Sequence, residues 1–150
     1  MVESPKPIKL DRPALVDTGV WSWVRDRRFP SLADWFDAAV AAGNVMICDQ
    51  IVLELVRAAP NPDAARRVEN SLMAFELIEM SHEVFNVARR VQMGLAADGT
   101  HRQIPTPDLL IAATAEIAAV PLIHHDADYP VIASVTGLDE RWFVPRGSLA

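Results

Sequence analysis

The sequence predicts an α/β fold in which a short, mostly parallel sheet is flanked by helices on both faces. Short apolar runs alternate along the chain with longer segments whose apolar residues recur at helical spacing. This alternation is typical of βαβ units, which place parallel strands in one sheet. The 150 residues match the size of one domain, and a hydrophobic content of 51% is enough for a buried core.

The N-terminal part of the chain is expected to be an extension followed by the first strand. Residues 1–13 are polar and contain prolines, so we expect a flexible extension there and place the domain at residues 14–150. The apolar run at 14–17 predicts a short buried strand, and residues 18–24 predict a loop and a turn after it.

The first helix is predicted at residues 31–42. Ser31 is of a type that caps helix N-termini, Asp34 stands at the reach-back position of a capping box, and Gly43 is a common helix stop. The apolar run at 44–48 directly after this stop predicts the second strand.

Two further helices and a strand are predicted next. Asp49 is a candidate cap for a helix at residues 49–58. Asn61 and Pro62 open another helix, because proline suits the first helical position. Residues 75–80 then predict the third strand.

The C-terminal half predicts the longest helix and the last strands. Ser81 is expected to cap a helix over residues 81–99. Its apolar stripe at helical spacing consists of Val84, Val87, Ala88, Val91 and Leu95. A helix at 107–119, a compact apolar strand at 120–124 and a terminal edge strand at 141–145 complete the prediction.

The composition excludes several classes of protein. With 14 basic and 20 acidic residues, the formal net charge of −6 argues against non-specific coating of nucleic acid, although a metal site can itself hold several carboxylates. The single cysteine, Cys48, excludes an internal disulfide and a paired-cysteine zinc site, and we expect it to be buried and inert. No apolar run approaches the roughly 20 residues of a membrane span, and the polar start is not a secretory signal. We therefore expect a soluble cytoplasmic domain.

Carboxylates occur where an open parallel sheet places its ligands, beyond the carboxyl ends of the strands. Asp17 directly follows the first predicted strand, and Asp126 and Asp128 follow the fourth. Asp108 lies in the first turn of a helix opened by Pro107. Each has a simpler interpretation as well: a turn residue or cap for Asp17, a favourable helix-dipole contact for Asp108, and ordinary loop acids for the other two.

Glu54 is the acid that a simple surface role explains least well. Its neighbours at helical spacing are apolar, namely Ile51, Leu55 and Ala58, so its face is expected to pack inward. A buried carboxylate must be paired, protonated or bound to metal. Arg57 is expected to point to another face, which leaves a structural ion pair with a distant arginine as the alternative.

Taken together, the acids indicate a metal site. Aspartate and glutamate oxygens suit a hard divalent cation such as Mg²⁺ or Mn²⁺. Such a cation can activate water and neutralise the charge on a phosphoryl group during in-line displacement. One carboxylate from each of several elements, all at one end of the sheet, is a plausible geometry for that chemistry.

Four segments of the chain resemble the PIN-domain nucleases, and most closely the VapC-type toxins of bacterial toxin–antitoxin pairs. They are VDTGVW, LELVRA, IPTPDLLIAATA and LIHHDADY. The last two are the most specific, whereas DTGVW alone would be a weak signal. The resemblance extends over residues 14–144 and implies a PIN-like form of the α/β fold.

This resemblance implies roles for individual residues. It implies a catalytic acidic cluster of Asp17, Glu54, Asp108 and Asp126, in which the three aspartates are the metal ligands. Asp128 and Thr18 are auxiliary candidates, Thr18 as a hydroxyl that orients water, and the nearer ligand of Asp126 and Asp128 stays open. Gly19 and the long extension before the first strand depart from the usual pattern.

The resemblance also implies a function. It implies a metal-dependent endoribonuclease toxin that acts on structured RNA such as tRNA or ribosomal RNA with Mg²⁺ or Mn²⁺. It further implies a homodimer and a cognate VapB-type antitoxin that fills the active-site groove. The alternative from another class is a catalytically idle PIN-like module that binds RNA or protein.

His124 and His125, just before Asp126, suggest a His–Asp metal phosphohydrolase as another alternative. The sites of that class lie on helices, whereas this pair ends an apolar strand. We therefore interpret both histidines as strand-end residues rather than ligands.

Two surface predictions remain. Arg25, Arg27 and Arg28 are the candidates for RNA contact, because a guanidinium group suits phosphate; solvated faces or local ion pairs are the alternative. The apolar residues Trp35, Phe36 and Val40 suggest a two-fold interface on the first predicted helix. The alternative there is that all three face the core of one protomer.

Overall fold

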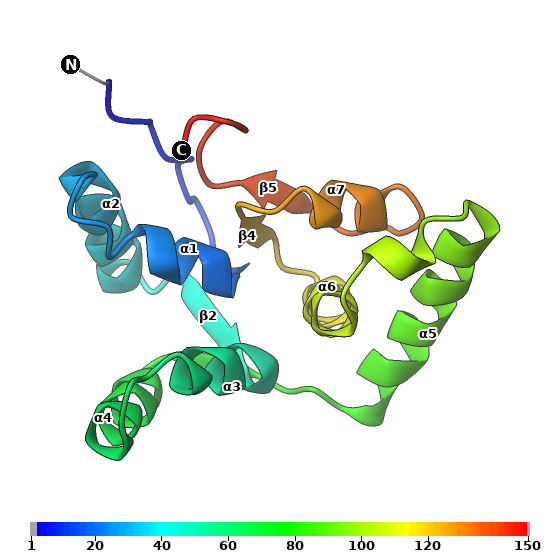
Figure 1. Cartoon of the computed structure of the whole chain (residues 1–150), viewed down its shortest axis with the longest axis horizontal. Coiled ribbons are helices and arrows are strands. Elements are labelled where there is room, and N and C mark those ends of the chain that lie inside the picture. Colours follow the sequence, from blue (N-terminus) through cyan, green and yellow to red (C-terminus); the bar gives the residue numbers. More distant parts are fainter. Residues whose placement is uncertain (1–2, 150) are drawn as a thin grey trace.

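In the part of the chain that the structure describes, five short strands form one parallel sheet in the order β3-β2-β1-β4-β5 (Figure 1). The computed structural model describes residues 3–149. The strands are β1 (Ala14–Val16), β2 (Val45–Cys48), β3 (Glu76–Ile78), β4 (Leu122–His124) and β5 (Glu140–Trp142). β1, β2 and β4 are buried along their whole length, as expected for a parallel sheet covered on both faces. The order reverses between β1 and β4, so a ligand site is expected beyond their carboxyl ends.

Helices connect and cover these strands. They are α1 (Thr18–Trp23), α2 (Pro30–Ala41), α3 (Asp49–Arg57), α4 (Pro62–Leu72), α5 (His82–Ala97), a 3₁₀ turn at His101–Gln103, α6 (Thr106–Ala118) and α7 (Asp128–Ala133). α5 packs along α6, and α3 packs against both α4 and α6. Within residues 3–149, no helix combines the length and the apolar character that a membrane crossing requires.

The predicted α/β class and the parallel sheet are confirmed, and two short helices differ from the prediction. Residues 18–23 form α1, where a loop and turn were expected. The helix forms because Asp17 caps it, with its side chain accepting a hydrogen bond from the Gly19 N–H, and because Val20 and Trp21 are buried against the core. α7 was not predicted, since its six residues are too few to show a helical period.

Helix capping follows the sequence in some places and not in others. Asn61 caps α4 as predicted, with its side chain accepting from the Ala64 N–H at 2.9 Å. Ser31 does not cap α2, which begins one residue earlier at Pro30, because proline is favoured in the first turn. Asp34 is therefore exposed rather than part of a capping box, and Asp49 is the first residue of α3 rather than its cap.

The core contains the predicted stripe of α5 and the predicted thiol. All five stripe residues are buried: Val84, Val87, Ala88, Val91 and Leu95. Cys48 is buried at the end of β2, as predicted, and burial raises the pKa of its thiol to about 11, which disfavours the reactive thiolate.

The apolar residues of α2 mostly pack within the protomer. The Trp35 ring lies 5.8 Å from that of Phe143, and the Phe36 ring lies 4.9 Å from that of Trp21, centroid to centroid. Only Val40 of the three is exposed. Trp35 and Phe36 are half-buried and pack partly against aromatic rings of the same chain, as the alternative expects, and the two-fold interface stays a prediction.

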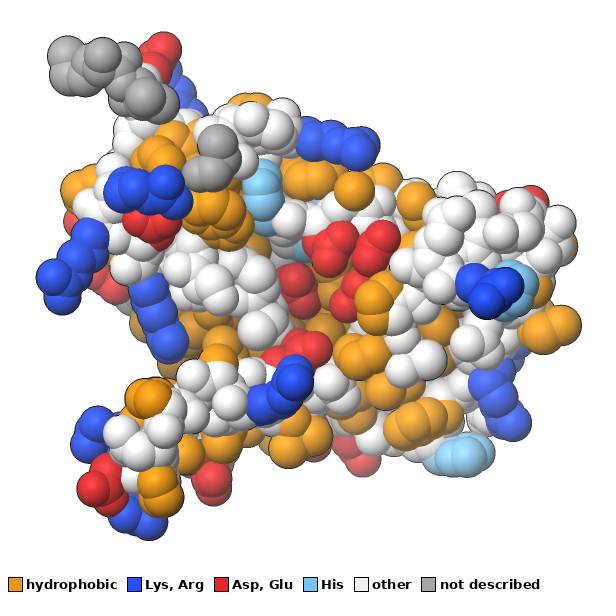
Figure 2. Space-filling model, viewed as in Figure 1, with side chains coloured by type: hydrophobic (Ala, Val, Ile, Leu, Met, Phe, Trp, Pro, Cys, Tyr) orange, Lys and Arg blue, Asp and Glu red, His pale blue; other side chains and the backbone are white. Residues whose placement is uncertain are grey.

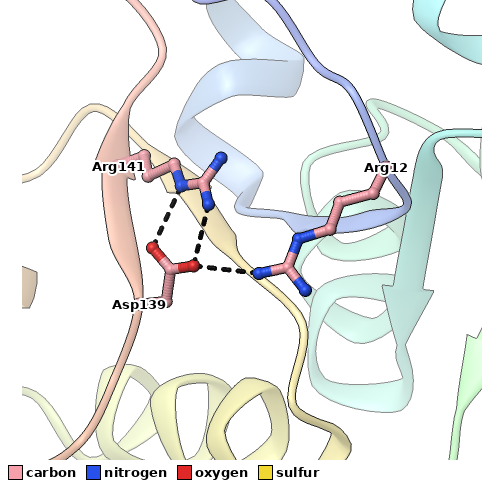
Figure 3. Close-up of polar contacts among 3 residues, drawn as sticks. All are labelled: Arg12, Asp139 and Arg141. Carbon is pink, nitrogen blue, oxygen red and sulfur yellow. Dashed lines mark hydrogen bonds and ion pairs between the residues drawn. The ribbon is translucent and has the colours of Figure 1, made fainter.

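The N-terminal extension lies beside the segment that follows β5. The Ile8 N–H donates to the Phe143 carbonyl, and the Trp35 indole donates to the Ile8 carbonyl. The Arg12 guanidinium bonds to Asp139, which also binds Arg141 of β5 (Figure 3). The described part of the extension, residues 3–13, contains no helix or strand, and these contacts attach it to the edge of the sheet; its flexibility stays a prediction.

Candidate active site

A cavity of about 340 Å³ lies beyond the carboxyl ends of β1 and β4. The residues that line it are Asp17, Thr18, Gly19, Glu54, Arg57, Asp108, His125 and Asp126. In Figure 2, acidic side chains gather around a hollow in the middle of the face shown. The four predicted catalytic acids therefore meet in one place, although they come from positions far apart in the sequence.

Asp17 is the most buried of these acids, with 7% of its surface exposed. The Tyr129 hydroxyl donates to its Oδ1 at 2.9 Å. Burial raises the pKa of Asp17 to about 6; the charge of Glu54 adds to this, and the Tyr129 hydrogen bond opposes it. The departure at Gly19 is harmless, because a Cβ there would lie 3.7 Å from Asp17 Oδ2, an ordinary contact distance.

Asp108 lies in the first turn of α6 and faces the other acids. Burial first, and then the charge of Asp126, raises the pKa of Asp108 to about 7. The carboxylate oxygens of Asp108, Asp126 and Asp128 lie within 4.8 Å of one another. Asp126 Oδ1 also accepts the backbone N–H of Asp128 at 2.9 Å. This compact set of oxygens fits a hard divalent cation.

Glu54 and Thr18, which also line the cavity, are hydrogen-bonded to each other. The Thr18 hydroxyl donates to Glu54 Oε2 at 2.5 Å. Its helical neighbours Ile51 and Leu55 are buried as expected, while Glu54 itself is half-buried and faces the cavity. Within residues 3–149 no arginine forms an ion pair with it, which removes the alternative of a structural ion pair.

Arg57 lines the same cavity, and the expectation that it would point elsewhere is wrong. It follows Glu54 by three positions on α3, and residues at this spacing share a helix face. The three-residue spacing from Glu54 was therefore the sequence signal that could have placed Arg57 beside the cavity. Arg57 is exposed and places a positive charge beside the acids.

The comparisons with known proteins agree with this geometry. The model of the PIN domain family matches residues 14–135. Ribonuclease VapC18 of Mycobacterium tuberculosis is 34% identical over 136 residues, which cover 89% of this chain and 97% of that protein. The chain belongs to the VapC ribonucleases of the PIN domain family. Ribonuclease VapC51 of the same organism is also 34% identical, over 90% of this chain and 96% of its own length.

Solved structures share this PIN fold at lower sequence identity. VapBC-1 from nontypeable Haemophilus influenzae superposes with a TM-score of 0.68 at 17% identity, covering 87% of this chain and 97% of that chain. VapBC-5 from Mycobacterium tuberculosis gives a TM-score of 0.61 at 20% identity, covering 87% and 98%. At these identities the likeness establishes the fold alone.

His124 and His125 lie in different surroundings in this PIN domain. His125 lines the cavity, which the sequence interpretation missed, and burial lowers its pKa. His124 is fully buried in β4 as a strand-end residue and pairs with Glu140 of β5. Within residues 3–149, the group of side chains that could hold a metal contains aspartates and neither histidine, which does not favour a His–Asp phosphohydrolase site.

The arginines predicted to contact RNA lie outside the cavity of the PIN domain. Arg25, Arg27 and Arg28 follow α1 and are all exposed. Arg28 binds Asp26, with 2.8 Å between Nη2 and Oδ2, so the alternative of a local ion pair is realised for this residue. The RNA contacts of this group stay a prediction.

Proposed function

We propose that this chain is an endoribonuclease toxin that hydrolyses RNA with Mg²⁺ or Mn²⁺ and is neutralised by a VapB-type antitoxin. The observation that carries the proposal is the convergence on one cavity of carboxylates from the β1–α1 junction, α3, α6 and the β4–α7 turn. Membership of the VapC ribonucleases supports the reaction class. An idle binding module would have no use for such a cluster of mutually repelling charges.

The donor set fits a divalent cation. We propose that Asp17, Asp108 and Asp126 hold it and that Asp128 assists. Burial and mutual repulsion raise the pKa of Asp17 and of Asp108, so the cluster lacks a compensating positive charge of sufficient strength. A bound cation would supply that charge, neutralise the scissile phosphate and lower the pKa of water.

The remaining cavity residues would orient the reactants. Thr18 donates to Glu54 and so holds this carboxylate toward the cavity, where it can accept a proton from the attacking water. Arg57 carries the planar guanidinium that suits a phosphate and faces the same space. We propose that it binds the RNA backbone next to the scissile bond, and that Arg25 and Arg27 contact RNA farther away.

The partners follow from the acidic character of the cavity. A cationic side chain of an antitoxin would be attracted to Asp17 and Asp108 when no metal is bound. VapBC-5 from Mycobacterium tuberculosis, which shares the fold, is a member of the VapBC family of toxin–antitoxin systems, and this supports such a partner. Structured RNA such as tRNA or ribosomal RNA, a homodimer and a cytoplasmic location are further parts of the proposal.

A cleavage assay separates this function from an idle binding module. Purified protein is incubated with total tRNA and with ribosomal RNA in Mn²⁺, and in parallel with EDTA. Defined fragments that appear only with Mn²⁺ are the expected result. Intact RNA under both conditions would favour the idle module, and sequencing of the fragment 5′ ends would identify the bond that is cut.

A further inference from the structure

A group of side chains that hydrogen-bonds to acids of the cavity has no role in the proposed reaction. This support layer consists of His124, Tyr129 and Glu140. The first two have no exposed surface, and their rings lie 5.0 Å apart between centroids. Glu140, on the edge strand β5, is partly buried, and its carboxylate pairs with His124 Nε2. The layer therefore connects the edge of the sheet to its centre.

Each fully buried member of the layer bonds to one acid of the cavity. His124 Nδ1 accepts the backbone N–H of Asp126 at 3.0 Å. The Tyr129 hydroxyl donates to Asp17 Oδ1 at 2.9 Å. The support layer thus contacts both acids that stand at the carboxyl ends of the central strands β1 and β4.

The hydrogen bonds of His124 define its tautomer. Because Nδ1 accepts from the Asp126 N–H, the ring proton lies on Nε2, from which it is donated to Glu140. The other tautomer would place an N–H against an N–H and leave the part-buried Asp126 amide without this acceptor. Glu140 therefore selects the form of the imidazole that can hold Asp126.

A shift of the hydrogen bond between His124 Nδ1 and the Asp126 N–H would displace two candidate ligands, Asp126 and Asp128, together. Asp126 Oδ1 accepts the N–H of Asp128, so both acids belong to one hydrogen-bonded turn. Their oxygens and those of Asp108 make up the compact acidic group. A change in the backbone at Asp126 would alter the distances within that group.

We propose that His124, oriented by Glu140, is a positioning residue that sets the carboxylates of Asp126 and Asp128 for metal binding, and that Tyr129 does the same for Asp17. This inference rests on the proposed metal-dependent function. Outer-shell partners of metal ligands typically change metal affinity or activity by about 10–100-fold when they are replaced, and the layer is expected to act within that range.

Asparagine and glutamine separate the two contacts of His124. An asparagine amide oxygen lies near the position of Nδ1 and can accept the Asp126 N–H. A glutamine amide reaches the position of Nε2, where it can donate to Glu140, but it leaves the Asp126 N–H without its acceptor. The variant His124→Gln should therefore weaken Mn²⁺ binding about 10–100-fold, whereas His124→Asn should stay closer to wild type.

Two carboxylate variants complete the set. Glu140→Gln keeps the size of a partly exposed side chain but removes the charge that favours the His124 tautomer with its proton on Nε2. It should therefore lower Mn²⁺ affinity, as His124→Gln does. If a His124 variant fails to fold, Glu140→Gln still tests the inference. The matched control is Glu116→Gln, because Glu116 accepts one hydrogen bond, from the Gly137 N–H at 3.3 Å, and does not line the cavity.

The measurements are Mn²⁺ binding by calorimetry without RNA, kcat and KM for RNA cleavage, and melting temperature. A positioning role predicts weaker Mn²⁺ binding and a lower kcat at nearly constant KM, with partial rescue by asparagine and no effect in Glu116→Gln. A purely structural role predicts a lower melting temperature with Mn²⁺ affinity as in wild type, and this result would overturn the inference. Equal losses in both His124 variants would also overturn it. A wild-type protein that binds no Mn²⁺ would instead refute the proposed function, and it is detected separately in the same titration.

Discussion

Replacing Asp108 by asparagine tests whether the acids of the cavity act as one site. Asn keeps the shape of the first turn of α6 and removes a charge that burial and the neighbouring acids disfavour. We expect Asp108→Asn to abolish RNA cleavage, because a candidate metal ligand loses its charge. In the absence of metal, we expect the same variant to be more stable than wild type.

The expected gain in stability follows from the pKa of Asp108. A rise from 3.8 to about 7 converts to an upper bound of about 4 kcal/mol. Asp108 is only partly buried, so screening by solvent reduces this penalty to about 1–2 kcal/mol. Loss of the favourable helix-dipole contact costs about 0.3–1 kcal/mol. The net gain of about 1 kcal/mol corresponds to a rise of about 2–4 °C in melting temperature.

The gain in stability of Asp108→Asn over wild type should increase as the pH rises. The pKa of Asp108 is higher in the folded than in the unfolded state, so ionisation destabilises the fold as pH rises above 3.8, and the penalty is complete above about 7. The variant should therefore exceed wild type in stability most clearly at about pH 8 and lose this advantage at about pH 4.

The assay combines melting curves with RNA cleavage, in EDTA and in Mn²⁺. Mn²⁺ should raise the melting temperature of wild type more than that of Asp108→Asn. The matched control is Asp63→Asn: Asp63 follows Pro62 in the first turn of α4 as Asp108 follows Pro107 in α6, but it is exposed and pairs with Arg66. The control should cleave RNA normally and lose a little stability. Cleavage by Asp108→Asn at the wild-type rate, or a loss of stability like that of the control, would refute the reasoning.

Three further predictions concern the cavity and the extension. The pKa values of Asp17 and Asp108 are raised to about 6 and about 7, so protons compete with the cation for these carboxylates. Mn²⁺ affinity measured by calorimetry should therefore increase from acidic to neutral pH. A constant affinity would contradict the metal assignment. Arg57→Gln should raise KM for RNA cleavage with little loss of kcat or of Mn²⁺ affinity, and an unchanged KM in steady-state kinetics would exclude the phosphate contact. Arg12→Gln removes an exposed ion pair with Asp139, so melting curves should show a loss of about 1 kcal/mol or less. A much larger loss would mean that the extension contributes more to the fold than this pair.

Local signals explain how much of the fold the sequence predicts. The three buried strands β1, β2 and β4 were predicted because they are short apolar runs, and the apolar stripe of α5 was predicted because its period is visible within one helix. The Asn61 cap needs only its own neighbours in sequence. The four acids of the site were selected because each follows a predicted strand or lies in a predicted helix, and family motifs surround them. All of these features depend on residues within a few positions of one another.

The remaining features depend on contacts between distant parts of the chain, so only the tertiary structure decided them. Asp17 and Tyr129 are 112 positions apart, and their hydrogen bond exists because β1 and β4 are neighbours in the sheet. The pairing of β4 with β5 likewise brings Glu140 to His124. The spacing of Arg57 from Glu54 puts both on one face of α3, but only the packing of that helix brings this face to the cavity. A sequence pattern specifies which face of an element is apolar, but the partner of each polar side chain is set by packing between elements.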